Sequence, residues 1–153
     1  MSKPSSNILS NTYGAKEFSK CRRIYYQIIT ENAIIEMIDN TKDGSKKSVA
    51  VGAYDVKTGK VATSFAKEIP SIIHEELIKR ANTIGGIGSH GVTDRNIVGV
   101  CAEFQVINKL LLSGSNISDI RLVKPVRPRT KEKIPFCANC QKMFEDIINK
   151  GEW

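Results

Sequence analysis

Three of the four cysteines in this chain have a spacing that suits metal binding. Cys137 and Cys140 form a Cys-x-x-Cys pair. Residues three apart at the start of a helix share one face, so both thiolates could bind one tetrahedral ion. Cys101 is expected to begin another helix, and the positive end of a helix dipole favours thiolates over thiols. The pattern predicts two helix N-termini that meet at one metal ion, with Zn²⁺ as the metal.

Glu103 lies two residues after Cys101 and is a candidate acid/base at the same site. Three protein ligands leave the fourth position of a tetrahedral zinc ion open, which is typical of catalytic rather than structural zinc. The metal lowers the pKa of a water molecule in that position, and Glu103 could take its proton and pass it to a leaving group. The residues therefore predict a hydrolytic zinc site.

Other interpretations of the cysteines stay open. The Cys-x-x-Cys pair could be redox-active, although the tryptophan and the β-α-β pattern of a thioredoxin-like motif are missing. The zinc could be structural, with Cys21 or a histidine as fourth ligand, or all three cysteines could be buried and inert. Cys21 lies in a helical pattern and is expected to be a buried apolar residue.

Composition and charge indicate one soluble globular domain with a net charge of +7 over 153 residues. No apolar run approaches the length of a membrane span, and the N-terminus lacks the apolar core of a signal peptide, so no membrane contact is expected. Six basic residues fall between Arg121 and Lys133, against one acid, Glu132. This cluster could bind nucleic acid or an acidic protein, or could be a solvated loop.

The hydrophobic periodicity predicts an α/β domain in which helices pack on a small mixed sheet. The expected helices cover residues 16–39, 70–80, 101–113 and 135–149, and the expected strands cover 48–54, 60–65 and 120–126. The apolar stripe of the first helix comprises Phe18, Cys21, Tyr25, Ile28, Ile35 and Ile38, and it is widened by Ile24, Ile34 and Met37. Residues 1–14 are expected to be a loose lead-in. We divide the chain into residues 1–47, the lead-in and amphipathic helix, and residues 48–153, the catalytic domain.

The stretch Cys101-Ala-Glu103, followed by Pro135-Phe-Cys-Ala-Asn-Cys140, resembles the signature of the zinc-dependent cytidine-deaminase superfamily. Within that superfamily the chain looks most similar to the bacterial polymorphic-toxin deaminases of the YwqJ-like type. This second resemblance rests on the Gly-rich run 85–91, on Arg127-Pro-Arg-Thr130 and on the residues around the second motif. The resemblance covers about residues 48–149.

The resemblance implies a cytidine-deaminase-like three-layer fold, with Cys101, Cys137 and Cys140 as Zn²⁺ ligands and Glu103 as proton shuttle. It implies hydrolytic loss of an exocyclic amine from a nucleobase, with cytosine the default, in nucleic acid or a nucleotide. It further implies a toxin domain of a secreted effector, delivered to the target-cell cytoplasm in interbacterial competition and blocked by a cognate immunity protein. The first ligand is Cys rather than the commoner His, which makes the site all-thiolate.

Four further residues are candidate substrate contacts. His90 in the Gly-rich loop could line the pocket or contact a phosphate, or could be an exposed loop residue. Arg127 and Arg129 could grip a nucleic-acid backbone, or could only speed encounter with it. Asn139 could hydrogen-bond a ligating sulfur. The alternative function is a non-catalytic, zinc-stabilised module that binds nucleic acid or protein.

Overall fold

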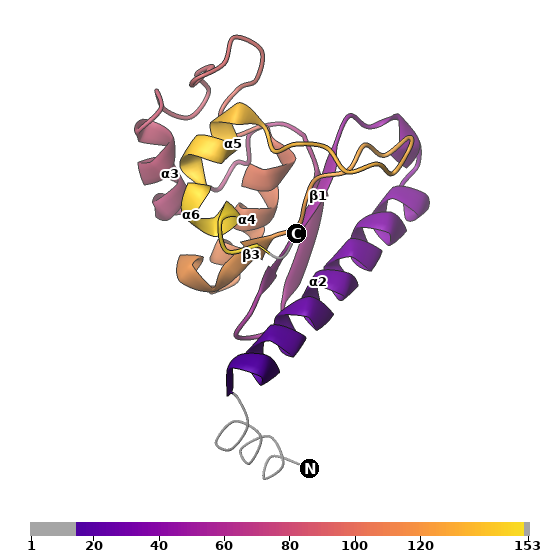
Figure 1. Cartoon of the computed structure of the whole chain (residues 1–153). Helices are drawn as coiled ribbons and strands as arrows, with labels where there is room; N and C mark the ends of the chain where they lie inside the picture. Colours follow the sequence, from indigo (N-terminus) through magenta and orange to yellow (C-terminus); the bar gives the residue numbers. More distant parts are fainter. Residues whose placement is uncertain (1–14, 152–153) are drawn as a thin grey trace.

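The computed structural model describes the backbone of residues 15–151 and the side chains from Ser19 onward. The lead-in expected over residues 1–14 and the side chain of Phe18 lie outside the described residues. The elements are α2 (Ala15–Asn40), η1 (Gly44–Lys46), β1 (Ala50–Asp55), β2 (Val61–Phe65), α3 (Glu75–Asn82), α4 (Ala102–Leu112), η2 (Ile117–Asp119), β3 (Ile120–Leu122), α5 (Ala138–Met143) and α6 (Glu145–Ile148). Figure 1 shows α2 on one side of the sheet and α4 on the other, with α3, α5 and α6 beyond α4.

The sheet of the described residues has three strands in the order β2-β1-β3. Both neighbours run antiparallel to β1, with Ala50 opposite Phe65 on one side and Ala53 opposite Leu122 on the other. The prediction of a mixed sheet is therefore wrong. β2 and β3 do run in the same direction, but β1 lies between them, so no two neighbouring strands in the described part are parallel.

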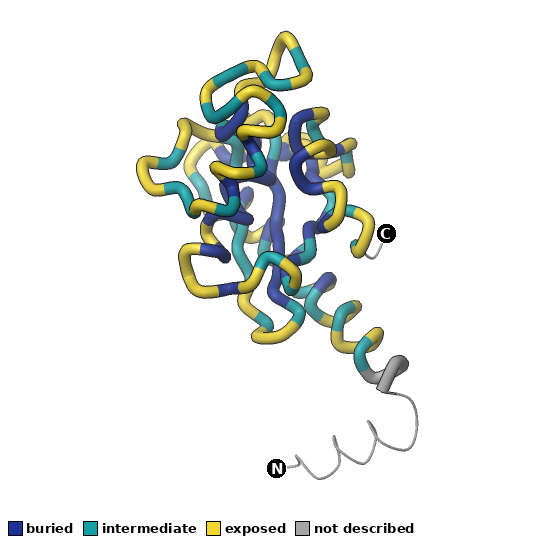
Figure 2. Tube along the Cα trace, turned by 90° about the vertical axis from the view of Figure 1, so that its left-hand side faces the viewer, coloured by how far each residue is buried: buried dark blue, intermediate teal, exposed yellow. Residues whose placement is uncertain are grey.

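The central strand β1 is buried along its whole length, because helices cover both of its faces. On one face Ala50 and Tyr54 pack with residues of α2 in one hydrophobic core. On the other face Val51 and Ala53 join a larger core around α4. The buried segments accordingly collect in the middle of the molecule (Figure 2). The predicted packing of helices on both faces of a small sheet is confirmed.

The face of α2 that packs on the sheet agrees with the predicted stripe at Ile34 and Ile38 and differs from it toward the N-terminus of the helix. Its buried residues are Gln27, Thr30, Ile34 and Ile38, whereas Cys21, Tyr25 and Ile28 are exposed. A Cβ atom at Gly52 of β1 would lie 2.5 Å from Thr30 Cγ2, so the helix approaches the strand closely where the strand has no side chain. This close approach selects the face with the small Thr30, and the prediction that Cys21 is buried is wrong.

Two predicted boundaries also differ in the second half of the chain. The strand expected over residues 120–126 ends at Leu122, and beyond it Val126 forms only isolated bridges with Ala50 and Lys133. The last helix divides at Phe144, whose φ of −123° and ψ of 27° are not helical. Phe144 is fully buried, so the break lets its ring enter the core.

The helix starts are set by capping residues rather than by the prolines. α3 begins after His74, whose Nδ1 accepts the N–H of Glu76 at 3.1 Å. α5 begins after Cys137 rather than at Pro135. Within residues 15–151 no helix combines the length and the apolar character that crossing a membrane requires.

Candidate metal and active site

Cys101 and Glu103 are positioned by α4, a helix that the fold encloses almost completely. Cys101 is the N-cap residue, and residues 102–108 are all buried. Two polar side chains tie this helix to the neighbouring loops. Gln105 Nε2 donates to the carbonyls of residues 67, 68 and 99, and Asn108 bonds the backbone of residues 72 and 74. The first turn of α4 therefore has a fixed position against the rest of the domain.

Cys137 and Cys140 are positioned by α5 and by contacts from α3. Cys137 is the N-cap residue of α5, and its Sγ accepts the N–H of Cys140 at 3.4 Å. Arg80 of α3 donates to the carbonyl of Met143 at 2.8 Å and forms a bidentate pair with Asp146 at 2.7 and 2.9 Å. These bonds fix the end of α5 and the start of α6 against α3.

The two helix starts bring three sulfur atoms together. The Sγ atoms of Cys101, Cys137 and Cys140 all lie within 4.8 Å of one another, and the first two are 2.9 Å apart. Two thiolates on one tetrahedral zinc ion lie about 3.8 Å apart, from a Zn–S bond of about 2.3 Å. The cluster thus has the dimensions of a metal site. In residues 19–151 no other His, Cys, Asp or Glu joins the group.

Hydrogen bonding and burial shift the pKa values of the three thiols in different directions. Hydrogen bonds from Cys101 and Cys140, helped by backbone N–H groups, lower the pKa of Cys137 to about 3. The bond that Cys101 donates to Cys137 raises the pKa of Cys101 far above its usual value. Burial raises the pKa of Cys140. Cys137 is thus the first thiolate, and a bound cation would displace the protons of the other two.

Glu103 is buried beside the cysteines but is not part of the group of ligand atoms. Its side chain is 2% exposed, and its Oε2 accepts the backbone N–H of Cys137 at 3.0 Å. Burial, together with the charge of Cys137, raises the pKa of Glu103 to about 7. A carboxyl group with this pKa can both accept and release a proton near neutral pH.

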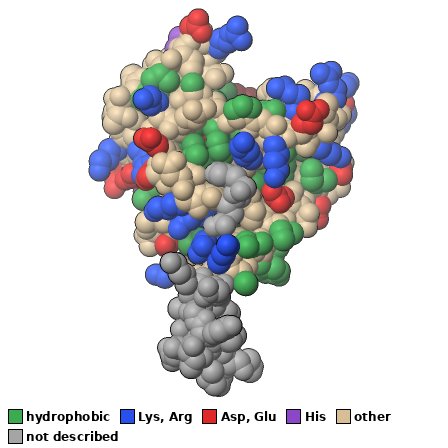
Figure 3. All heavy atoms as spheres, viewed as in Figure 1, with side chains coloured by type: hydrophobic (Ala, Val, Ile, Leu, Met, Phe, Trp, Pro, Cys, Tyr) green, Lys and Arg blue, Asp and Glu red, His purple; other side chains and the backbone are tan. Residues whose placement is uncertain are grey.

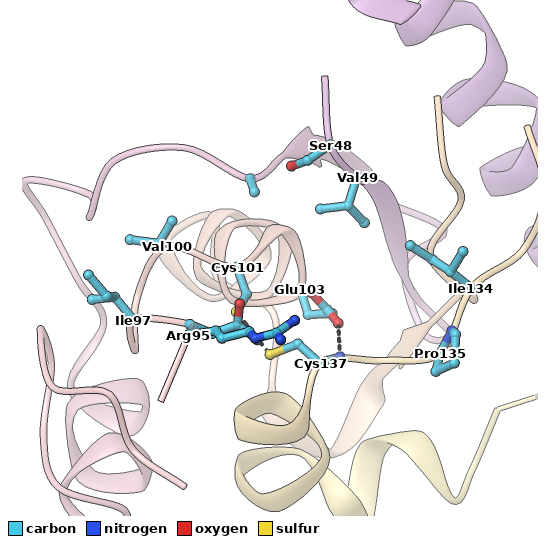
Figure 4. A pocket seen from close by; sticks show the side chains of 12 residues that line it. Ser48, Val49, Arg95, Ile97, Val100, Cys101, Glu103, Ile134, Pro135 and Cys137 are labelled. Atoms are coloured by element: carbon cyan, nitrogen blue, oxygen red, sulfur yellow. Dashed lines mark hydrogen bonds between the residues drawn. The ribbon is translucent and has the colours of Figure 1, made fainter. Parts of the chain in front are cut away.

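A pocket of about 360 Å³ opens onto Cys101, Glu103 and Cys137 (Figure 4). Its apolar lining comprises Val49, Ala66, Ile97, Val100, Ile134 and Pro135, and its polar lining adds Ser48, Arg95 and Asn96. A mostly apolar pocket with a few converging polar groups is the usual form of a small-molecule site. In Figure 4 the dashed bond from Cys137 N–H to Glu103 lies directly at this pocket.

None of the four predicted substrate contacts is among the residues that line this pocket. The side chain of Asn139 is turned to the Gly-rich loop, where Oδ1 accepts the N–H of Val92 at 2.8 Å and Nδ2 donates to the carbonyl of His90 at 3.1 Å. Its backbone N–H, rather than its side chain, is the group that bonds the Cys137 sulfur. The His90 side chain is exposed and is not among the described residues that line the pocket.

Arg127 and Arg129 do not line this pocket either, but they line a hollow next to it, together with residues 45–48. Cys21, His74 and His90 are not in the cysteine group, so the described residues give no support to a structural zinc with one of them as fourth ligand. Structural zinc with Cys21 or a histidine was the most specific alternative that the sequence left open.

Sequence reasoning missed Arg95 and Asn96, which line the pocket from the loop before α4. Their position just ahead of the first motif was the available signal, but the fold of a loop decides which of its side chains reach the pocket. The roles of Gln105 and Asn108 were also missed. Two amide side chains three apart in a mostly apolar helix were the signal for buried loop contacts.

The fold and the site define an α/β protein with a three-cysteine candidate metal centre beside a buried carboxylate. No protein-family model, curated protein or solved structure matches the chain.

Proposed function

We propose that this chain is a zinc-dependent hydrolytic deaminase of a nucleobase, with cytosine as the first candidate. The observation that carries the proposal is the position of Glu103. Its buried carboxylate lines the pocket beside three clustered cysteines, yet it stands outside the group of ligand atoms. A carboxyl group in this position is suited to proton transfer, because metal binding does not occupy it.

The donor set of Cys101, Cys137 and Cys140 fits zinc, because soft thiolates in a tetrahedral arrangement favour this ion among the common metals. A zinc ion held there would lower the pKa of a water molecule in the pocket toward neutrality. Three protein ligands leave room for that water, which separates this arrangement from closed structural sites.

The protons of a hydrolytic deamination would pass through Glu103. Water adds to the ring carbon, the exocyclic C–N bond breaks, ammonia leaves and a carbonyl remains on the base. One proton moves from the water to the ring nitrogen, and another moves to the departing amine. Glu103 is the one carboxyl group among the described residues that line the pocket, so it would make both transfers.

The pocket suits a flat heterocycle. Its walls are apolar on several sides, with Val49, Val100 and Ile134 among them. A base bound between such walls is held by stacking and van der Waals contact, while polar groups at the floor select its orientation. The volume of about 360 Å³ is at the lower end of small-molecule sites, as one base requires.

The biological role we propose follows from the resemblance of the sequence motifs alone. In this role the chain is the toxin domain of a secreted bacterial effector that acts in the cytoplasm of a target cell. A cognate immunity protein would protect the producing cell by covering the pocket. Sequencing the DNA and RNA of cells that express the domain tests which base and which nucleic acid are modified. C-to-T changes in the DNA or in the RNA would identify both.

The direct test of the chemistry is the substitution Glu103→Gln. The amide can still accept the N–H of Cys137, so folding and the zinc content should stay as in the wild type. Ammonia release from cytosine-containing DNA, RNA, cytidine and CMP should fall by at least about a hundredfold, the usual contribution of an acid/base. Glu145→Gln, which changes an exposed carboxyl on α6, is the matched control.

Metal analysis accompanies this test, and about one zinc per chain is expected. If Glu103→Gln keeps full activity, or the purified protein holds well under one zinc, the deaminase proposal is wrong. If zinc is bound but no substrate in the panel releases ammonia from the wild type, the chain is better described as a zinc-stabilised binding module.

A further inference from the structure

A second hollow, which we call the basic groove, adjoins the pocket. It has a volume of about 570 Å³ and is lined by Ser45, Lys46, Lys47, Ser48, Arg127 and Arg129. Ser48 lines both the basic groove and the pocket, so the two adjoin at this residue. Figure 3 shows Lys and Arg side chains gathered at the upper right of the molecule, where η1 and the loop of residues 126–133 lie in Figure 1.

The cations that line the basic groove are mostly free of acidic partners. Lys131 pairs with Asp39 at 3.0 Å and Lys133 pairs with Glu31 at 3.3 Å, so both of these loop lysines are bonded to α2. In the groove Lys46 lies 3.6 Å from Asp43. Lys47, Arg127 and Arg129 form no ion pair within the described part of the chain.

The backbone holds the two arginines in place. The bridge between Val126 and Lys133 closes the loop into a hairpin, and Arg127 both donates to the carbonyl of Glu132 at 2.8 Å and accepts the N–H of Lys131 at 2.7 Å. Unpaired cations on a fixed backbone are suited to bind an anion at little cost in conformational entropy.

Another unpaired cation lies on a different side of the pocket. Arg95 comes from the loop before α4 and forms no ion pair among the described residues. In Figure 4 its side chain lies on the Cys101 side, whereas Ile134 and Pro135 form the opposite wall. Ser48, which also lines the basic groove, lies away from Arg95 in this view. The pocket is thus flanked by unpaired positive charge in two directions.

From this distribution we infer that the substrate is a single strand of nucleic acid that crosses the pocket. The basic groove holds phosphates on one side of the target base, and Arg95 contacts a phosphate on the other. A strand presents phosphates on both sides of each base, whereas a free nucleotide presents them on one side only. This inference rests on the proposed deaminase function, because it assumes that the pocket holds a base.

A single strand is favoured over a duplex because the base must enter a pocket at the level of the cysteines. A base in a duplex must first unpair and unstack, whereas a base in a single strand is already accessible. Single-strand binding of this kind combines a positive groove for the backbone with apolar surfaces for the bases.

Binding of short fluorescent oligonucleotides to the zinc-loaded protein tests the inference without relying on catalysis. The variant Lys47→Gln/Arg127→Gln/Arg129→Gln removes the three cations of the basic groove that have no acidic partner among the described residues. Each lost phosphate contact reduces the slope of log K against log salt by about 0.7 for a single strand, so the slope should fall by about 2. Affinity at moderate salt should fall at least about tenfold.

The matched control is Lys57→Gln/Lys79→Gln/Lys142→Gln, which removes the same charge from exposed positions that line neither the pocket nor the basic groove. It should keep most of the wild-type affinity and slope. Single-stranded DNA, single-stranded RNA, duplex DNA and CMP are compared in parallel. The single strands should bind most tightly, and the better of the two identifies the sugar.

Equal losses in the two triple variants, or no loss in either, overturn the inference. Loss of binding to an acidic immunity protein with unchanged oligonucleotide affinity overturns it as well.

The outcome is separable from that of the deaminase proposal. If the basic groove binds single strands but no ammonia is released, the strand-binding inference is supported and the deaminase proposal is wrong. The opposite outcome is that the wild type deaminates single strands no faster than cytidine and the groove variant is as active as the wild type on both. The deaminase proposal is then supported and the strand-binding inference is wrong.

Discussion

Glu103 and Asn139 are both buried polar residues next to the cysteines, but their hydrogen bonds differ in a way that separates their roles. The carboxylate of Glu103 accepts the backbone N–H of Cys137 and lines the pocket. Asn139 uses both its amide oxygen and its amide nitrogen to hold the loop of residues 90–92. Glu103 is therefore open to a substrate, whereas Asn139 stabilises the loop that precedes the first motif.

The substitution Asn139→Ala should loosen this loop. It removes two hydrogen bonds to a buried side chain and should cost about 1–3 kcal/mol of unfolding free energy. Limited proteolysis should cut faster near residues 90–95, while the zinc content stays unchanged. Urea unfolding and mapping of the cleavage sites measure both effects. Asn149→Ala, at an exposed position, is the control.

If Asn139→Ala instead loses zinc and keeps the loop protected, Asn139 supports a sulfur as the sequence first suggested. The loop also depends on Gly91, which has a φ of +63°. A Cβ atom there would collide with Asn139 Oδ1, so the two residues fit only in this combination.

The cysteines and Glu103 could be predicted as one site because their chemistry depends on residue type and short spacing. Arg95 and Asn139 could not be assigned, because their roles depend on the direction in which a loop or a helix turns its side chains. An asparagine between two ligands is equally able to face a sulfur or a loop. Only the packing of the Gly-rich loop against α5 decides this.

Among the elements, α3 supports the second half of the cysteine site through one side chain. Arg80 is mostly buried and bonds Glu76 in its own helix, Met143 at the end of α5 and Asp146 in α6. The hydrogen bond and charge of Asp146 raise the pKa of Arg80, and the Arg80 hydrogen bond lowers the pKa of Asp146. The pair thus links the two short helices α3 and α6.

Asp146→Asn should reduce stability in a pH-dependent way. Because the pKa of Asp146 is lowered in the folded protein, the pair stabilises fully above the unfolded pKa of about 3.9, and this contribution is lost as the pH falls through the folded value. At neutral pH the variant should be less stable by about 0.5–1 kcal/mol, a value reduced for the exposure of the carboxyl. Toward the acid end the two proteins should converge.

Urea unfolding at several pH values measures this difference, and any acid release of metal is common to both proteins and cancels. Glu145→Gln, at the adjacent exposed position, should show no such convergence. A constant difference between wild type and Asp146→Asn at every pH would mean that the charge of the pair contributes nothing.

At this scale the sequence predicted the helices and strands themselves well, because apolar periodicity and turn residues are local signals. It failed for the direction of strand pairing, the buried face of α2 and the break at Phe144. Each of these is decided by contacts between distant segments. Gly52 selects the face of α2, and the last helix breaks where the Phe144 ring is buried in the core.

In the whole molecule the sheet separates two cores that serve different purposes. The core under α2 contains Ile34, Ile38 and Tyr54 and reaches none of the cysteines. The core around α4 contains Cys101 and Cys140 together with Phe104 and Phe144. The pocket lies at the edge of this second core, close to the start of β1 at Val49. The candidate metal centre therefore belongs to one side of the sheet.

This separation predicts how the molecule responds when zinc is removed. α5 has only six residues and cannot be stable alone, so the zinc ion that we propose at the three cysteines should contribute most of its local stability by joining it to α4. Chelation should lower the unfolding temperature by about 10 °C, the shift expected for a ligand at about a thousandfold above its dissociation constant. Hydrogen–deuterium exchange should rise in residues 134–148 and at the start of α4, while the buried middle of α2 and the β1–β2 hairpin keep their protection.

Cys21→Ser should behave as the wild type, because this exposed cysteine lies outside the cluster. Equal loss of protection in α2 would mean that the ion holds the entire fold, and an unchanged unfolding temperature would mean that the three cysteines bind no metal.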